Sequence, residues 1–145
     1  MRREHSSVMV ADWPLWRYWH VTRYPLLVGL LLVAALSASW WFYQLSWWWL
    51  QLTLLLATAV VTVWNNQRTF GQPGGQLLQA VAAGGCYGFW IGLGIGIAQF
   101  VWQPAVWSFF YLLASPLWQT LVAIIVSFIA GYVYLHWWPG NRSSH

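Results

Sequence analysis

Four long apolar stretches that contain no Asp, Glu, Lys or Arg constrain the fold of this chain more than any other feature. They run from about Tyr24 to Tyr43, Ser46 to Trp64, Leu77 to Trp102 and Leu117 to Trp138. A helix needs about 20 residues to cross the hydrocarbon core of a bilayer. Each stretch therefore predicts one transmembrane helix.

The composition excludes other classes of protein. Charged side chains make up 6% of the chain, against about 25% in an ordinary soluble domain. The 15 tryptophans exclude a disordered chain, because disordered segments are poor in aromatic residues. The apolar runs are continuous, whereas the strands of a membrane β-barrel alternate, and backbone groups in lipid must be paired within the segment. We expect an all-α membrane protein, a four-transmembrane-helix bundle of two helical hairpins.

The connections between the predicted spans differ in character. Gln44 to Ser46 predicts a tight turn, and Asn65 to Gln76 predicts a longer polar loop with three glycines and a proline. The third connection contains an apolar segment, Ala105 to Ser115, between Pro104 and Pro116. Because this segment is too short to span the membrane, we expect a short interfacial or re-entrant helix between the third and fourth spans.

The first 23 residues predict a cytoplasmic segment that is distinct from the spans. Asp12 is placed to cap a helix with Pro14 at its second position. The helix would mix aromatic residues with Arg17, His20 and Arg23, which suits an amphipathic interfacial helix; a helix that docks on a partner protein is the alternative. The expected organisation is a cytoplasmic segment over 1–23, a transmembrane domain over 24–138 and a cytoplasmic tail over 139–145.

Arginine predicts the orientation of the bundle. It occurs in three of the five segments outside the predicted spans, all on one side of the membrane: Arg2, Arg3, Arg17, Arg23, Arg68 and Arg142. Under the positive-inside rule, both termini are cytoplasmic, and the membrane is a plasma membrane or a bacterial inner membrane. The arginines form no continuous basic face, so we expect no nucleic-acid partner.

Tryptophan supports the same arrangement, because indole rings prefer the two membrane interfaces. The residues expected to anchor the bundle at these interfaces are Trp13, Trp16, Trp19, Trp40, Trp41, Trp47, Trp48, Trp49, Trp137 and Trp138. An aromatic cage for a cation or a sugar at Trp47 to Trp49 is the functional alternative.

The third span carries a glycine zipper, in which every fourth residue is glycine. Glycine costs about 1 kcal/mol relative to alanine within a helix, so four at one spacing indicate a face where another backbone approaches closely. A matching row of small residues occurs in the last span. The expected helix-packing or oligomer seam comprises Gly84, Gly88, Gly92, Gly96, Ala123, Ser127 and Gly131.

The sequence offers few candidate residues for acid–base catalysis or metal binding. Both acidic residues, Glu4 and Asp12, precede the first span, which leaves no carboxylate pair for catalysis or metal binding within the bundle. His20 and His136 could ligate a haem or a metal if they faced each other, but no further ligand follows at a recognisable spacing. We expect no enzyme activity, no metal and no cofactor. Gln51 and Gln99 form either a polar mouth or hydrogen bonds between helices.

These observations lead to two functional hypotheses. The first is a non-catalytic small integral membrane subunit, a scaffold or accessory component of a larger membrane complex or homo-oligomer. Its partners would be membrane lipids and either other membrane protein subunits or further copies of itself. The alternative is an oligomeric channel or facilitator for a neutral or lipophilic substrate, formed along Gly84 to Gly96.

Overall fold

A computed structural model describes residues 9–44, 46–102 and 106–137. Its elements in chain order are β1 (Met9–Val10), β2 (Trp13–Pro14), α1 (Leu15–Tyr43), α2 (Trp47–Phe70), α3 (Leu77–Trp102) and α4 (Val106–Trp137). The two short strands pair antiparallel. All four helices are long and apolar enough to cross a membrane. The chain is thus an all-helical protein that is consistent with integral membrane insertion.

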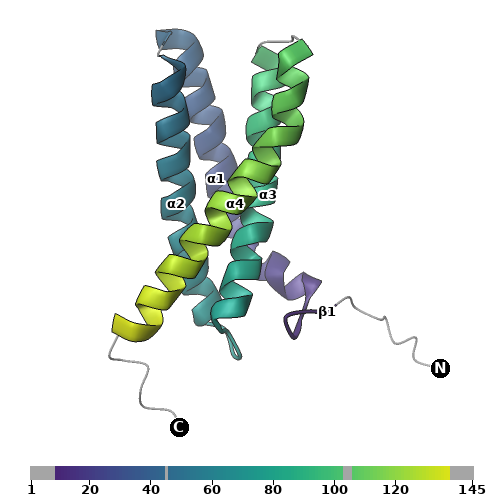
Figure 1. Ribbon diagram of the computed structural model, residues 1–145, viewed down its shortest axis with the longest axis vertical. Coiled ribbons are helices and arrows are strands. Elements are labelled where there is room, and N and C mark those ends of the chain that lie inside the picture. The colour runs from purple at the N-terminus through teal and green to yellow at the C-terminus, as the bar shows by residue number, and fades with distance from the viewer. Residues whose placement is uncertain (1–8, 45, 103–105, 138–145) are drawn as a thin grey trace, which may run out of the picture.

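Figure 1 shows the four helices as two neighbouring pairs. The end of α1 and the start of α2 lie at the upper end of the view, as do the end of α3 and the start of α4, and there the two pairs are apart. From there α4 descends diagonally in front of α3 and then α2, so that α4 contacts both. The closest packing in the bundle is between α3 and α4.

The apolar core lies where α1, α2 and α3 meet. Its buried members are Leu26, Val33, Leu50, Leu54, Val61, Tyr87, Ile91 and Ile95. The outward faces of the helices also carry large apolar side chains, among them Leu31, Val60 and Ile129. Exposed leucine and isoleucine are unfavourable in water but match the surrounding lipid in a membrane. The apolar residues are therefore divided between an inner core and an outward-facing surface that would suit lipid.

Helix α1 begins earlier than the predicted first span and runs through Pro25. The expected separate N-terminal helix is thus the first part of α1, and the prediction that Asp12 caps it is wrong. Asp12 instead lies at φ 65° in the turn between β1 and β2, beside Ala11 at φ 47°. A proline leaves the carbonyl four residues earlier without its helical donor. That carbonyl belongs to Val21, and Arg68 of α2 donates its Nε hydrogen to it at 3.0 Å.

Helix α2 continues to Phe70, so the predicted polar loop is shorter and begins at Gly71. The prediction treated Asn65, Asn66 and Thr69 as loop residues because they are polar. All three are buried in the bundle, where Asn66 and Thr69 donate side-chain hydrogen bonds to the backbone oxygens of Ser127 and Asn65.

Helix α4 begins at Val106 and passes through Pro116, so no separate helix precedes the fourth span. Close packing on α3 explains this continuity. A Cβ added at Gly92 would lie 2.5 Å from Cα of Pro116, and one added at Gly96 would lie 2.9 Å from Cα of Leu112. The expectations for Pro104, Ala105, Trp138 and the segments 1–8 and 139–145 lie outside the described residues.

Candidate functional site

The glycine zipper of α3 lies directly against α4 of the same chain. A Cβ added at Gly88 would lie 2.5 Å from the backbone oxygen of Gln119 and 2.7 Å from Cβ of Ala123, and one added at Gly84 would overlap the hydroxyl of Ser127. Gly131, the last residue of the matching row, faces Leu77 and Phe70 instead. The glycine face is therefore covered within one chain.

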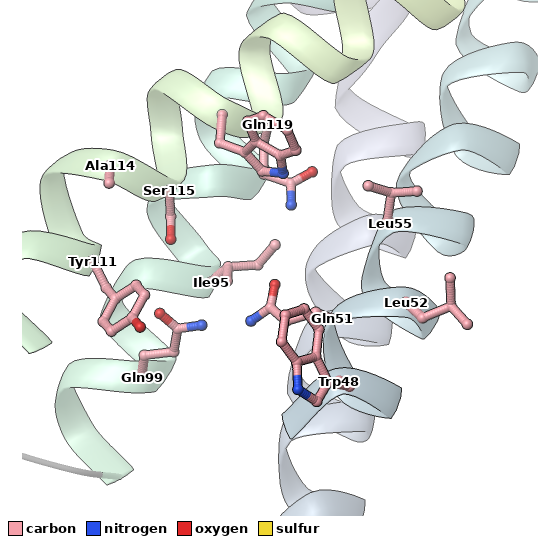
Figure 2. Close-up of a pocket in the computed structure, with 11 residues that line it drawn as sticks. Trp48, Gln51, Leu52, Leu55, Ile95, Gln99, Tyr111, Ala114, Ser115 and Gln119 are labelled. Carbon is pink, nitrogen blue, oxygen red and sulfur yellow. The ribbon is translucent and has the colours of Figure 1, made fainter. Parts of the chain in front are cut away.

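Tight pairing of α3 with α4 leaves a cavity on the side that faces α2. Its volume is about 570 Å³. Its walls are mainly apolar, with glutamine, serine and tyrosine side chains among them. Figure 2 shows the lining residues, which are Trp48, Gln51, Leu52, Leu55, Ile95, Gln99, Tyr111, Ala114, Ser115, Trp118 and Gln119.

Three carboxamides from three different helices meet in this cavity. Gln51 comes from α2, Gln99 from α3 and Gln119 from α4. Their side chains point inward, and the amide nitrogens of Gln51 and Gln99 face each other across the gap (Figure 2). Gln119 is only 2% exposed, and neither its Oε1 atom nor that of Gln99 has a hydrogen-bond partner among the described residues. Buried polar groups in proteins are nearly always paired, so these two oxygens call for an explanation.

The close approach of the α3 and α4 backbones determines where along the helices these side chains meet. Gln99 lies one turn beyond Gly96, and Gly96 packs against Leu112 and the carbonyl of Tyr111. Pro116, which lies one turn before Gln119, removes the helical hydrogen bond to the carbonyl of Leu112. The glycines and the proline thus place polar side chains and a backbone carbonyl without its helical donor at one end of the bundle.

Gln99 and Tyr111 also line a second, smaller cavity of about 40 Å³, to which all four helices contribute residues. Its other walls include Ser37, Trp40 and Ser108. Near this cavity the ring of Trp41 of α1 stacks on Trp102 of α3, a lining residue, with centroids 5.1 Å apart. Polar side chains therefore extend from the main cavity toward α1.

The main cavity is electrically neutral. The residues that line it include no Asp, Glu, Lys, Arg or His. Burying an isolated ion in such surroundings costs far more than burying a neutral polar group that is hydrogen-bonded. The site therefore favours an uncharged occupant that offers hydrogen bonds to the carboxamides and apolar surface to the walls.

A buried polar stripe continues along α2 from this cavity toward the other end of the bundle. Thr58, Thr62, Asn65 and Thr69 are each at most 3% exposed. Next to them, Asn66 donates its amide hydrogen to the backbone oxygen of Ser127 at 3.0 Å. This stripe was not predicted from the sequence, although the spacing of seven residues from Gln51 to Thr58 and on to Asn65 marks one face of a helix.

The predicted interface tryptophans differ in how far they are exposed. Trp16, Trp19, Trp41, Trp48, Trp49 and Trp137 are exposed, and Trp40 is partly buried. The side chain of Trp47 and all of Trp138 lie outside the description. Trp13 differs from expectation, since it is 3% exposed and the Arg17 guanidinium lies 4.3 Å from its ring centroid. Arg17 also donates to the carbonyl of Pro73 at 2.6 Å, so both residues hold the N-terminal hairpin against the loop between α2 and α3.

The structure does not bring the two candidate histidine ligands together. His20 lies beside Arg17 near the start of α1, whereas His136 stacks on Tyr132 near the end of α4 with ring centroids 4.0 Å apart. Figure 1 places these two helix ends on opposite sides of the lower part of the bundle. Among the described residues, no group of three or more His, Cys, Asp or Glu side chains is arranged to hold a metal ion.

Comparisons of the chain with protein-family models, curated proteins and solved structures found no match.

Proposed function

We propose that this chain is a small, non-catalytic membrane subunit that holds a neutral, largely apolar molecule in the cavity between α2, α3 and α4. The observation that carries the proposal is the convergence of Gln51, Gln99 and Gln119 in a cavity whose other walls are mainly apolar. Its volume of about 570 Å³ falls within the range of about 300 to 1,000 Å³ that is typical of small-molecule sites.

The chemistry of the lining supports binding in preference to catalysis. Carboxamides donate and accept hydrogen bonds, but they do not exchange protons near neutral pH, so they act as positioning groups. Leu52, Leu55 and Ile95 would cover the apolar part of the ligand. A facilitator that passes a lipophilic substrate and an accessory subunit that stores or presents one are both compatible with this role.

The experiment that tests the proposal is recovery of the ligand. The full-length protein is transferred from its native membrane into lipid nanodiscs, and retained small molecules are identified by mass spectrometry against empty nanodiscs. The variant Gln119→Met removes the most deeply buried of the three carboxamides in the cavity. The matched control Gln67→Met changes an exposed glutamine on α2. We expect a neutral lipophile that is retained by the wild type and by Gln67→Met but is depleted in Gln119→Met. Equal retention by all three proteins contradicts the proposal.

A second candidate function is an accessory subunit that receives side chains of a partner protein's transmembrane helix in the same cavity. The aromatic rim favours it, because Trp48 and Trp118 line the cavity and are 82% and 56% exposed. Exposed tryptophans beside a pocket are typical of the residues that dominate protein contacts. Crosslinking in native membranes would then give a partner adduct that is lost in Trp118→Ala, and an unchanged adduct pattern contradicts this candidate.

The proposed setting is a plasma membrane or a bacterial inner membrane with both termini in the cytoplasm. Arg17 and Arg68 support this orientation, because they come together at the end of the bundle where α1 begins and α2 ends. Since α4 covers the glycine face, the proposal does not include a pore built along Gly84 to Gly96 between copies of the chain.

A further inference from the structure

We infer, on the basis of the proposed binding function, that the ligand is a neutral lipophile with a hydrogen-bond acceptor that lies between the amide nitrogens of Gln51 and Gln99. A ketone or ester carbonyl has the required chemistry. This assigns the class of ligand and the two side chains that recognise its polar group.

The orientation of the carboxamides carries the inference. Figure 2 shows the nitrogen atoms of Gln51 and Gln99 facing one another across the gap. Two facing donors repel each other slightly, but an acceptor atom between them receives a hydrogen bond from each. In Figure 2 the nitrogen of Gln119 also points toward the centre of the cavity. The cavity thus presents several donors to one small volume.

The buried oxygen atoms leave the amide nitrogens as the polar groups that a ligand in the cavity can reach. Oε1 of Gln99 and Oε1 of Gln119 are both shielded from contact, so a ligand that enters the cavity meets the amide nitrogens first. A ligand that only donates hydrogen bonds would place its hydrogen against these N–H groups. A charged ligand would lose its hydration without gaining an opposite charge, because the lining carries none.

Three bicyclic compounds of nearly the same size separate these possibilities. The probes are 5-fluoro-1-indanone, which only accepts hydrogen bonds; 5-fluoroindole, whose ring N–H only donates; and 5-fluoroindane, which does neither. Binding to the full-length protein in lipid nanodiscs is measured by fluorine NMR, with empty nanodiscs to subtract partitioning into lipid. Two hydrogen bonds to the carbonyl predict that the indanone binds roughly tenfold more tightly than the indane.

Substitutions assign the effect to the two side chains. In Gln51→Met or Gln99→Met, we expect the advantage of the indanone over the indane to fall from roughly tenfold to roughly threefold, because each change removes one of the two donors and keeps a side chain of similar volume. The control Gln67→Met lies on an exposed position of α2 and should keep the advantage.

The outcomes distinguish this inference from the proposed function. Saturable binding of all three probes with equal affinity overturns the acceptor assignment and leaves the lipophile site standing. Tighter binding of the indole than of the indanone also overturns it. If no probe binds beyond empty nanodiscs, the proposed function and this inference fail together. Loss of binding of all probes in a Gln→Met variant is separated from unfolding by the far-UV circular dichroism of that variant.

Discussion

Replacement of Gly88 by alanine should force α3 and α4 apart. The added Cβ would lie 2.5 Å from the backbone oxygen of Gln119, which is 0.9 Å closer than the 3.4 Å at which ordinary contact begins. It would also lie 2.9 Å from Cα of Thr120. Because backbone atoms cannot swing away as a flexible side chain can, the two helices must move, and overpacking of this kind costs about 1 to 3 kcal/mol.

The matched control is Gly85→Ala on the same helix. Its Cβ would meet only side-chain atoms of Ile124, the nearest at 3.4 Å, which is ordinary van der Waals contact. Both variants gain about 1 kcal/mol of helix propensity when glycine becomes alanine. The difference between them therefore isolates the packing cost, and we expect Gly88→Ala to be less stable than Gly85→Ala by about 1 to 3 kcal/mol.

The assay is reversible unfolding in mixed micelles with increasing SDS, followed by far-UV circular dichroism. Gly85→Ala should be as stable as the wild type or slightly more stable, and Gly88→Ala should be less stable than both. Equal free energies of unfolding for the two variants would refute the argument that the backbones of α3 and α4 touch at Gly88.

Two further predictions use the same unfolding measurement, and a third uses amide hydrogen exchange. Arg68→Leu should lower the free energy of unfolding by about 1.5 to 3 kcal/mol, the range for a hydrogen bond to a charged group. The loss should be smaller in a Pro25→Ala background, because there a backbone N–H can donate to the Val21 carbonyl. Equal losses in both backgrounds contradict the claim that Arg68 replaces the donor that Pro25 lacks. Asn66→Leu should cost about 0.6 to 1.7 kcal/mol through its lost bond to α4, and an unchanged stability would show that this bond contributes nothing. Ala11 has a left-handed backbone conformation that costs about 1 to 2 kcal/mol for a residue with a Cβ, so Ala11→Gly should stabilise the N-terminal hairpin. Amide hydrogen exchange in the hairpin should become slower, and faster exchange contradicts this prediction.

The absence of charged residues predicted the four helices well, but polarity proved a poor guide to their ends. Asn65, Asn66 and Thr69 read as a loop in the sequence, yet they face the interior of the bundle. The prolines were also poor guides to the helix ends. Pro25 and Pro116 both lie within continuous helices. At Pro25 a side chain of another helix supplies the missing hydrogen bond, and no pattern within α1 alone reveals that partner.

The candidate cavity was only partly visible in the sequence. Gln51 and Gln99 stood out as polar positions near the ends of two spans, but their meeting with Gln119 depends on how α4 crosses α3 and reaches α2. The glycine spacing predicted a close contact face and left open whether that contact lies within one chain or between copies. The crossing of helices fixes which side chains share a cavity, and it follows from packing over the whole bundle.

The most direct test of the central claim is to map where a lipophilic acceptor binds. The full-length protein in nanodiscs is photolabelled with a diazirine-bearing aryl ketone, and the modified peptides are sequenced by mass spectrometry. We predict adducts on the cavity walls, at Leu55, Ile95 and Ser115, that excess unlabelled 1-indanone suppresses. Adducts spread over outward-facing residues such as Leu31 and Val60, with none on the cavity walls, would contradict the account.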